Sequence, residues 1–141
     1  MDMTSLITGT DFITLPTRDF ERAVEFYGGV LELEESKRWG NMPGAEFETG
    51  NLTIAVMQPD AFGLEFNANK FPVELRVDDF EAAKAELEQR GIEFKGDTID
   101  SGVCFQAHFE DPFGCRPHPH LPRTRSIAPG RSCRWPSGLS R

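Results

Sequence analysis

The chain has 141 residues, 38% of them hydrophobic, which suits one packed domain or two small halves sharing a core. No apolar run approaches the roughly 20 residues of a membrane span, and the N-terminus lacks the features of a signal peptide, so we expect a cytoplasmic protein. The net charge of −8 argues against nucleic acid as a partner.

The first half of the chain predicts one β-α-β-β-β unit. The expected strands cover residues 11–16, 31–39, 45–48 and 52–58. Asp19 can cap a helix whose apolar residues recur at i, i+3, i+4 and i+7 from Phe20. Gly28 and Gly29 should weaken or end that helix, and a hairpin turn is expected at Gly50-Asn51.

The same pattern returns sixty positions later. Phe12–Tyr27 corresponds to Pro72–Leu87, so that Asp79 is expected to cap a second helix. Further strands are expected at residues 71–77, 92–94 and 102–109. A repeat at this spacing indicates two equivalent structural units.

The pattern breaks after Gly114. Residues 115–141 hold five of the ten prolines and six arginines but no acidic residue. Closely spaced prolines remove the donors that a central strand needs, so we expect a basic, irregular tail in place of the last strand. One hypothesis is a frame-shifted reading, because sliding the back-translated residues 115–122 by one base permits Ala-Ala-Leu-Ile-Leu-Ile-Tyr. Sequencing the encoding DNA tests it.

The predicted class is α+β. The predicted divisions are a first module at residues 1–58, a connector at 59–70, a truncated second module at 71–114 and the tail at 115–141. Residues 1–114 carry 9 Lys and Arg against 23 Asp and Glu. This acidity would suit a cationic ligand, although it also simply favours solubility.

Several motifs resemble the vicinal oxygen chelate superfamily of glyoxalase I, bleomycin-resistance proteins and extradiol dioxygenases. They are Asp19–Ala23 with Phe26-Tyr27, Val77–Phe80, Arg90–Phe94 and Phe109–Gly114. The resemblance implies paired β-α-β-β-β modules whose curved mixed sheets surround a cavity, often shared between two chains. A homodimer is therefore expected.

The resemblance also implies where a metal would bind. Metal-dependent relatives carry His or Gln at the positions of Phe12 and Pro72, neither of which offers a side-chain lone pair. Another ligand is a Glu late in the first unit, but Leu52–Met57 contains no carboxylate. The last ligand position holds His118. The pattern therefore indicates a metal-free member with no cofactor.

If the ligand positions that the resemblance implies face the cavity, strand alternation adds Thr14 and Glu74 to Phe12 as candidate ligand-binding residues. Trp39, Phe47, Met57 and Phe105 are further candidates, as aromatic and soft walls of the cavity. Glu74 is the weak catalytic candidate, because an apolar cavity could raise its pKa and let it act as an acid, a base or a partner for a cation. It could equally be an exposed surface residue, and the aromatic residues could simply be core. His108 should face away from Phe105.

Three functions remain open at this stage. The first is metal-free binding of a small aromatic or cationic molecule in a cavity between modules, as in bleomycin-resistance proteins. The second is a metal-dependent glyoxalase-like lyase, isomerase or dioxygenase, which needs a metal that the residues do not support. The third is a sensor that uses the same pocket. Whether the protein is an enzyme is left open.

Overall fold

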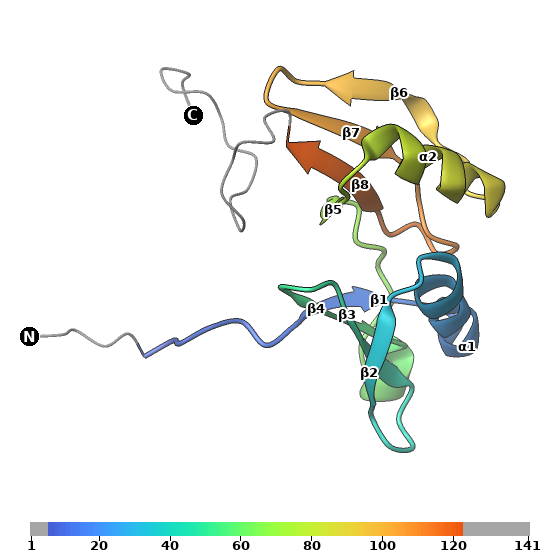
Figure 1. Cartoon of the computed structure of the whole chain (residues 1–141). Coiled ribbons are helices and arrows are strands. Elements are labelled where there is room, and N and C mark those ends of the chain that lie inside the picture. The colour runs from blue at the N-terminus through green and yellow to red at the C-terminus, as the bar shows by residue number, and fades with distance from the viewer. Residues whose placement is uncertain (1–5, 123–141) are drawn as a thin grey trace, which may run out of the picture. The chain divides into compact units, whose positions relative to one another are not determined.

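The computed structural model describes residues 6–122, apart from the side chains of His118 and Pro122. The chain divides into two compact units, one ending at Ala68 and the other beginning at Asn69. Each unit holds a four-stranded mixed sheet and one α-helix (Figure 1). The predicted α+β class and the repeated β-α-β-β-β order are confirmed. No helix within residues 6–122 is long and apolar enough to cross a membrane.

The first unit contains a sheet with the strand order β1-β4-β3-β2. Its strands are β1 (Ile13–Pro16), β2 (Glu34–Arg38), β3 (Gly44–Glu48) and β4 (Thr53–Met57). The first strand pairs in parallel with β4, and the other neighbours are antiparallel. The helical segments are α1 (Phe20–Val24), the π-helix η1 (Glu25–Val30) and the 3-10 helix η2 (Pro59–Phe62).

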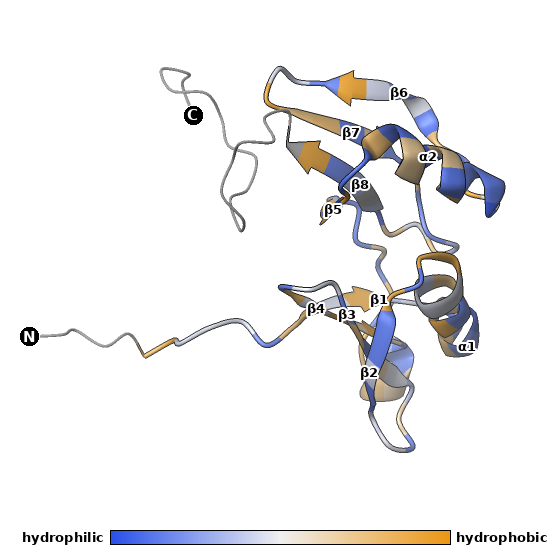
Figure 2. Ribbon diagram, viewed as in Figure 1, coloured by the Kyte–Doolittle hydropathy of each residue, from blue (hydrophilic) through white to orange (hydrophobic). Residues whose placement is uncertain are grey.

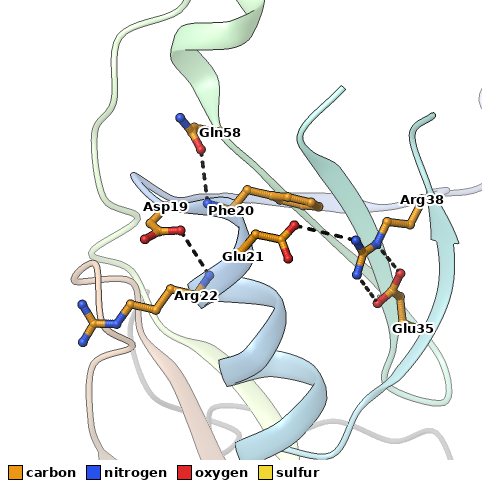
Figure 3. A network of polar contacts seen from close by, with 7 residues as sticks. All are labelled: Asp19, Phe20, Glu21, Arg22, Glu35, Arg38 and Gln58. Atoms are coloured by element: carbon orange, nitrogen blue, oxygen red, sulfur yellow. Dashed lines mark hydrogen bonds and ion pairs between the residues drawn. The ribbon is translucent and has the colours of Figure 1, made fainter. Parts of the chain in front are cut away.

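The start of α1 is fastened to the sheet by side chains (Figure 3). The Asp19 carboxylate caps the helix by accepting a hydrogen bond from the Arg22 N–H at 3.2 Å, as predicted. The Phe20 N–H donates to Gln58 Oε1 at 3.2 Å, just beyond β4. On β2, Arg38 binds the Glu35 carboxylate through its Nε at 2.6 Å and forms an ion pair with Glu21 of α1 at 3.9 Å. These contacts fix the direction in which the helix leaves β1.

The helical segment continues through Gly28 and Gly29, which were expected to weaken or end the helix, but it is no longer an α-helix there. The backbone widens into η1, and the Leu31 N–H donates to the Phe26 carbonyl, five residues back, at 3.0 Å. A Cβ at Gly28 would lie 3.3 Å from Cε1 of Phe47, so the missing side chain leaves room for that ring.

The second unit has the strand order β5-β8-β7-β6. Its elements are β5 (Val73–Arg76), α2 (Phe80–Gln89), β6 (Lys95–Asp100), β7 (Cys104–His108) and β8 (Pro117–Pro122). Asp79 caps α2 by accepting the Ala82 N–H at 3.1 Å. Helix α2 contacts β8, and α1 contacts β4 in the first unit, so each helix covers one face of its own sheet.

The strand expected at residues 92–94 was misplaced, because the structure forms β6 at Lys95–Asp100 instead. Both β2 and β6 are edge strands with largely exposed residues, and Figure 2 shows hydrophilic residues along β2. Polar residues on an edge discourage pairing with other chains. They also remove the apolar alternation by which a strand is predicted.

The expectation of an irregular segment from Cys115 onward was wrong for Pro117–Pro122, which form β8 between β5 and β7. The prolines are tolerated because they lose donors on one side only. The carbonyls of Arg116 and His120 accept hydrogen bonds from the β5 side, at 2.8 and 2.9 Å. Even-numbered residues therefore direct their backbone groups to β5, whereas Pro117 and Pro119 would donate toward β7.

The pairing of β8 follows this division. Its register with β5 runs from Pro117 to His120, whereas its register with β7 is formed at His120, Leu121 and Pro122. The predicted tail beyond Pro122 lies outside the described residues. The frame-shift hypothesis concerns the gene and remains a proposal. The apolar strand that it would restore corresponds to the position of β8 in the sheet.

We predict that Pro119→Val stabilises the second unit. The new N–H faces β7 and can extend the β7–β8 ladder, which should raise the free energy of unfolding by about 1 kcal/mol. Urea denaturation measures the change. Pro112→Ala is the control, since Pro112 lies in the turn closed by the Gly114 N–H and the Asp111 carbonyl, and its removal should not stabilise. An unchanged or lower stability of Pro119→Val would contradict the hydrogen-bond account.

Candidate functional site

The two faces of the first sheet carry different side chains. Leu15, Phe47, Ile54 and Val56 are almost fully buried, and the rings of Phe47 and Tyr27 lie 6.1 Å apart, so this face packs on the helical segment. The opposite face, here called the distal face of the first sheet, carries the alternate residues. They are Thr14, Gly44, Glu46, Ala55 and Met57.

An aromatic cluster lies at one end of this distal face. The Trp39 ring lies between two phenylalanines, with its centroid 5.9 Å from that of Phe12 and 5.9 Å from that of Phe62. The Trp39–Phe62 pair is edge-to-face, an arrangement that aromatic rings favour. Phe12 is 40% exposed and Phe62 is 37% exposed, so the cluster offers apolar surface to a ligand.

A carboxylate holds the central ring of the cluster in place. The Trp39 indole N–H donates to Glu46 Oε2 at 2.8 Å. The ring also lies directly over Gly44, where an added Cβ would come within 2.1 Å of it. Glycine at this position is therefore required for the ring to lie on the sheet. The arrangement places a negative charge at the edge of an aromatic surface.

The predicted site residues of the first unit divide between the faces. Phe12, Thr14, Trp39 and Met57 lie with the distal face, although Met57 is largely buried. Phe47 does not, because it packs against Tyr27 in the core beneath the helical segment. Because successive side chains of a strand point to opposite faces of the sheet, Phe47 faces the helical segment and its neighbour Glu46 faces the distal side.

The second sheet has the same division. The Phe105 ring lies 6.0 Å from that of Phe80 on α2, so Phe105 is a half-buried residue on the helix side of the sheet and does not line the distal face. Gln106 and His108 alternate with it and face away from α2, as predicted for His108. The register places His120 opposite Gln106 and Arg76 opposite His120. Arg76, Gln106, His108 and His120, together with Glu74, form the distal face of the second sheet.

Two titratable groups on this face are perturbed by burial. Burial raises the pKa of Glu74 to about 7, and its Oε2 atom is shielded from solvent. Burial lowers the pKa of the His120 imidazole, and the nearby charge of Arg76 lowers it further. At neutral pH the Glu74 carboxyl is thus partly protonated, which is the behaviour expected of an acid–base group.

The side chains that the structure describes do not fit a divalent metal site. Phe12 and Pro72 stand where metal-dependent relatives would supply ligands, and β4 contains no carboxylate. Among the residues that the structure describes, no three His, Cys, Asp or Glu side chains form a group that could hold a metal ion. Neither Glu74 with the two described histidines nor Glu46 with its neighbours makes such a group.

Sequence reasoning missed Glu46, Phe62, Arg76, Gln106 and His120 as site residues. Phe62 lies in a short 3-10 helix that gave no periodic signal. The pairing of Glu46 with Trp39 depends on the β2–β3 register, which has a bulge. His120 was assigned to an irregular tail because of the prolines around it. If side chains are assumed to alternate along residues 104–108, Gln106 lies on the face opposite Phe105, so strand alternation could have identified it.

Comparisons with known proteins agree with this architecture. The family model "Glyoxalase/Bleomycin resistance protein/Dioxygenase superfamily" matches residues 9–116. No curated protein sequence matches the chain.

Solved structures in the same superfamily are similar over most of the chain. A glyoxalase family protein from Bacillus anthracis is 26% identical with a TM-score of 0.69, over 86% of this chain and 100% of that one. A glyoxalase/bleomycin resistance protein/dioxygenase from Nocardioides is 24% identical with a TM-score of 0.68, over 92% and 93%. Lactoylglutathione lyase from Agrobacterium tumefaciens, at 15% identity and a TM-score of 0.68 over 83% and 96%, shares the fold.

We predict that Glu74 makes the stability of the protein depend on pH. Because its pKa is higher in the folded state than in the unfolded chain, its contribution is fully present below about pH 4 and is lost as the pH rises through about 7. The difference in unfolding free energy between wild type and Glu74→Gln should therefore fall over that interval. Subtracting the two curves cancels the opposite trend from His120, whose lowered pKa favours stability at higher pH. A difference that does not change with pH would show that Glu74 titrates normally.

Proposed function

Because the chain belongs to the glyoxalase/bleomycin resistance protein/dioxygenase superfamily, we propose that it binds a small, planar aromatic cation without the help of a metal. The ligand contacts the aromatic cluster and Glu46 on the distal face of the first sheet. The observation that carries this proposal is the exposed Phe12–Trp39–Phe62 cluster with a carboxylate at its edge.

Aromatic side chains supply the apolar part of the affinity. Exposed phenylalanine surface gains free energy when a flat ligand removes it from water, and ring pairs add about 0.5–1.5 kcal/mol beyond burial. The faces of such rings also attract cations. Trp39 needs little rearrangement, because Glu46 and Gly44 already hold it on the sheet.

Glu46 supplies the preference for positive charge. Its Oε2 accepts the indole N–H, and a carboxylate can accept further hydrogen bonds. Glu48, two residues along, is differently engaged, since it accepts hydrogen bonds from Ser36 Oγ at 2.5 Å and Thr53 Oγ1 at 2.8 Å. These hydrogen bonds lower the pKa of Glu48, with the larger effect from Ser36, and favour its charged form. Two anionic side chains thus lie on the strand beside the aromatic cluster.

A glyoxalase-type lyase is the less favoured function. Such chemistry uses a metal to polarise the substrate, and two of the positions that would supply its ligands hold phenylalanine and proline.

We predict that purified protein, dialysed without chelator against buffer, retains less than one-tenth of an equivalent of Zn, Ni, Fe or Mn. An occupied site would give about one equivalent. Elemental analysis by mass spectrometry measures this. Stoichiometric metal that survives dialysis would restore the lyase hypothesis.

We predict that benzylammonium binds roughly five- to tenfold more tightly than benzyl alcohol of the same shape. Fluorescence of Trp39 in a Trp135→Phe background, where it is the one tryptophan left, reports binding at this ring. Glu46→Gln should remove the preference for the cation while retaining weak binding of both compounds. Glu88→Gln, which removes one charge from α2, should leave the preference unchanged. Equal affinities for the two compounds in the parent protein would refute the proposed ligand class.

A further inference from the structure

Three hydrogen-bond donors form a row across the distal face of the second sheet. Arg76 of β5 lies opposite His120 of β8, which in turn lies opposite Gln106 of β7. Side chains opposite each other on adjacent strands are direct neighbours, with Cβ atoms about 5 Å apart. A guanidinium, an imidazole and a primary amide are therefore next to one another on the same face.

The charges in this row favour an anion. His120 is only 7% exposed, and both its burial and the charge of Arg76 disfavour its protonation. The row therefore places a permanent cation beside a buried imidazole whose protonated form is disfavoured. An oxyanion between them would accept charge-assisted hydrogen bonds from Arg76 and would favour protonation of His120.

The titratable side chains that share this face, within the described residues, include Glu74, Cys104, His108 and Lys95, and the Gln106 amide donates a hydrogen bond to Cys104 Sγ at 3.5 Å. Glu74 lies two residues before Arg76 on β5, His108 lies two residues after Gln106 on β7, and Lys95 of β6 lies opposite His108. Because the pKa of Glu74 is raised to about 7, its carboxyl is mostly neutral in mildly acidic solution. It becomes an anion at higher pH and would then repel a bound oxyanion.

We propose that Arg76, His120 and Gln106 bind the carboxylate group of a small organic acid, and that Glu74 weakens this binding when it ionises. A planar carboxylate matches the fork of a guanidinium and can accept the amide and imidazole protons with its remaining lone pairs. The site goes beyond the aromatic cation site, because it uses other residues in the other unit and the opposite ligand charge. Either site can therefore fail without the other.

Calorimetric titration with benzoate and with its neutral analogue benzamide tests the site. At pH 6.0 benzoate should bind about tenfold more tightly than benzamide, and the preference should shrink by pH 8.5. Arg76→Gln should abolish the preference. The control Arg90→Gln should keep it, because Arg90 is ion-paired with Glu86 on α2. Glu74→Gln should keep the preference and remove most of its loss between pH 6.0 and 8.5.

A second variant guards against loss of folding. Gln106→Glu places a negative charge in the row and should eliminate benzoate binding, while a near-ultraviolet circular dichroism spectrum equal to that of the parent protein shows that the protein is folded. Equal affinities for benzoate and benzamide, or benzoate binding that survives either Arg76→Gln or Gln106→Glu, would overturn the site. A benzoate preference that is the same at pH 6.0 and 8.5 would overturn the role of Glu74.

Discussion

The packing of one helix on one face of each sheet determines which side chains remain for a ligand. Tyr27 against Phe47 in the first unit and Phe80 against Phe105 in the second fix that face. Because side chains alternate along a strand, each of these core contacts directs the next residue, Glu46 or Gln106, to the distal face. The chemistry of each distal face thus follows from where the apolar residues are buried.

The two distal faces, built on the same repeated pattern, differ in character. The first has an aromatic cluster with glutamates beside it, whereas the second has arginine, histidine and glutamine with one buried carboxyl. Position 14 of the first unit and position 74 of the second are equivalent in the repeat, yet one is threonine and the other glutamate. A duplicated scaffold therefore carries two surfaces suited to groups of opposite charge.

The repeat made the fold predictable, because the caps Asp19 and Asp79 and the spacing of apolar residues are local signals. The faces were harder to predict. Phe12 and Phe47 are the same residue type, and only the strand register shows that one is exposed beside Trp39 and the other is core. The edge strand β6 is polar, so its sequence lacks the alternation of apolar residues by which a strand is predicted. The prolines of β8 were correctly recognised as lacking the N–H donors that pairing needs. Whether β5 or β7 loses these hydrogen bonds depends on the strand to which the backbone of each proline is directed.

We propose that the distal face of the first sheet, rather than a metal centre, receives the ligand. A map of ¹H–¹⁵N chemical-shift changes during titration with benzylammonium tests this proposal. The resonance of the Trp39 indole N–H should move most, accompanied by those of backbone amides of β3 and of the segment around Phe12. Shifts confined to the helices, or an indole resonance that does not move at saturation, would contradict it.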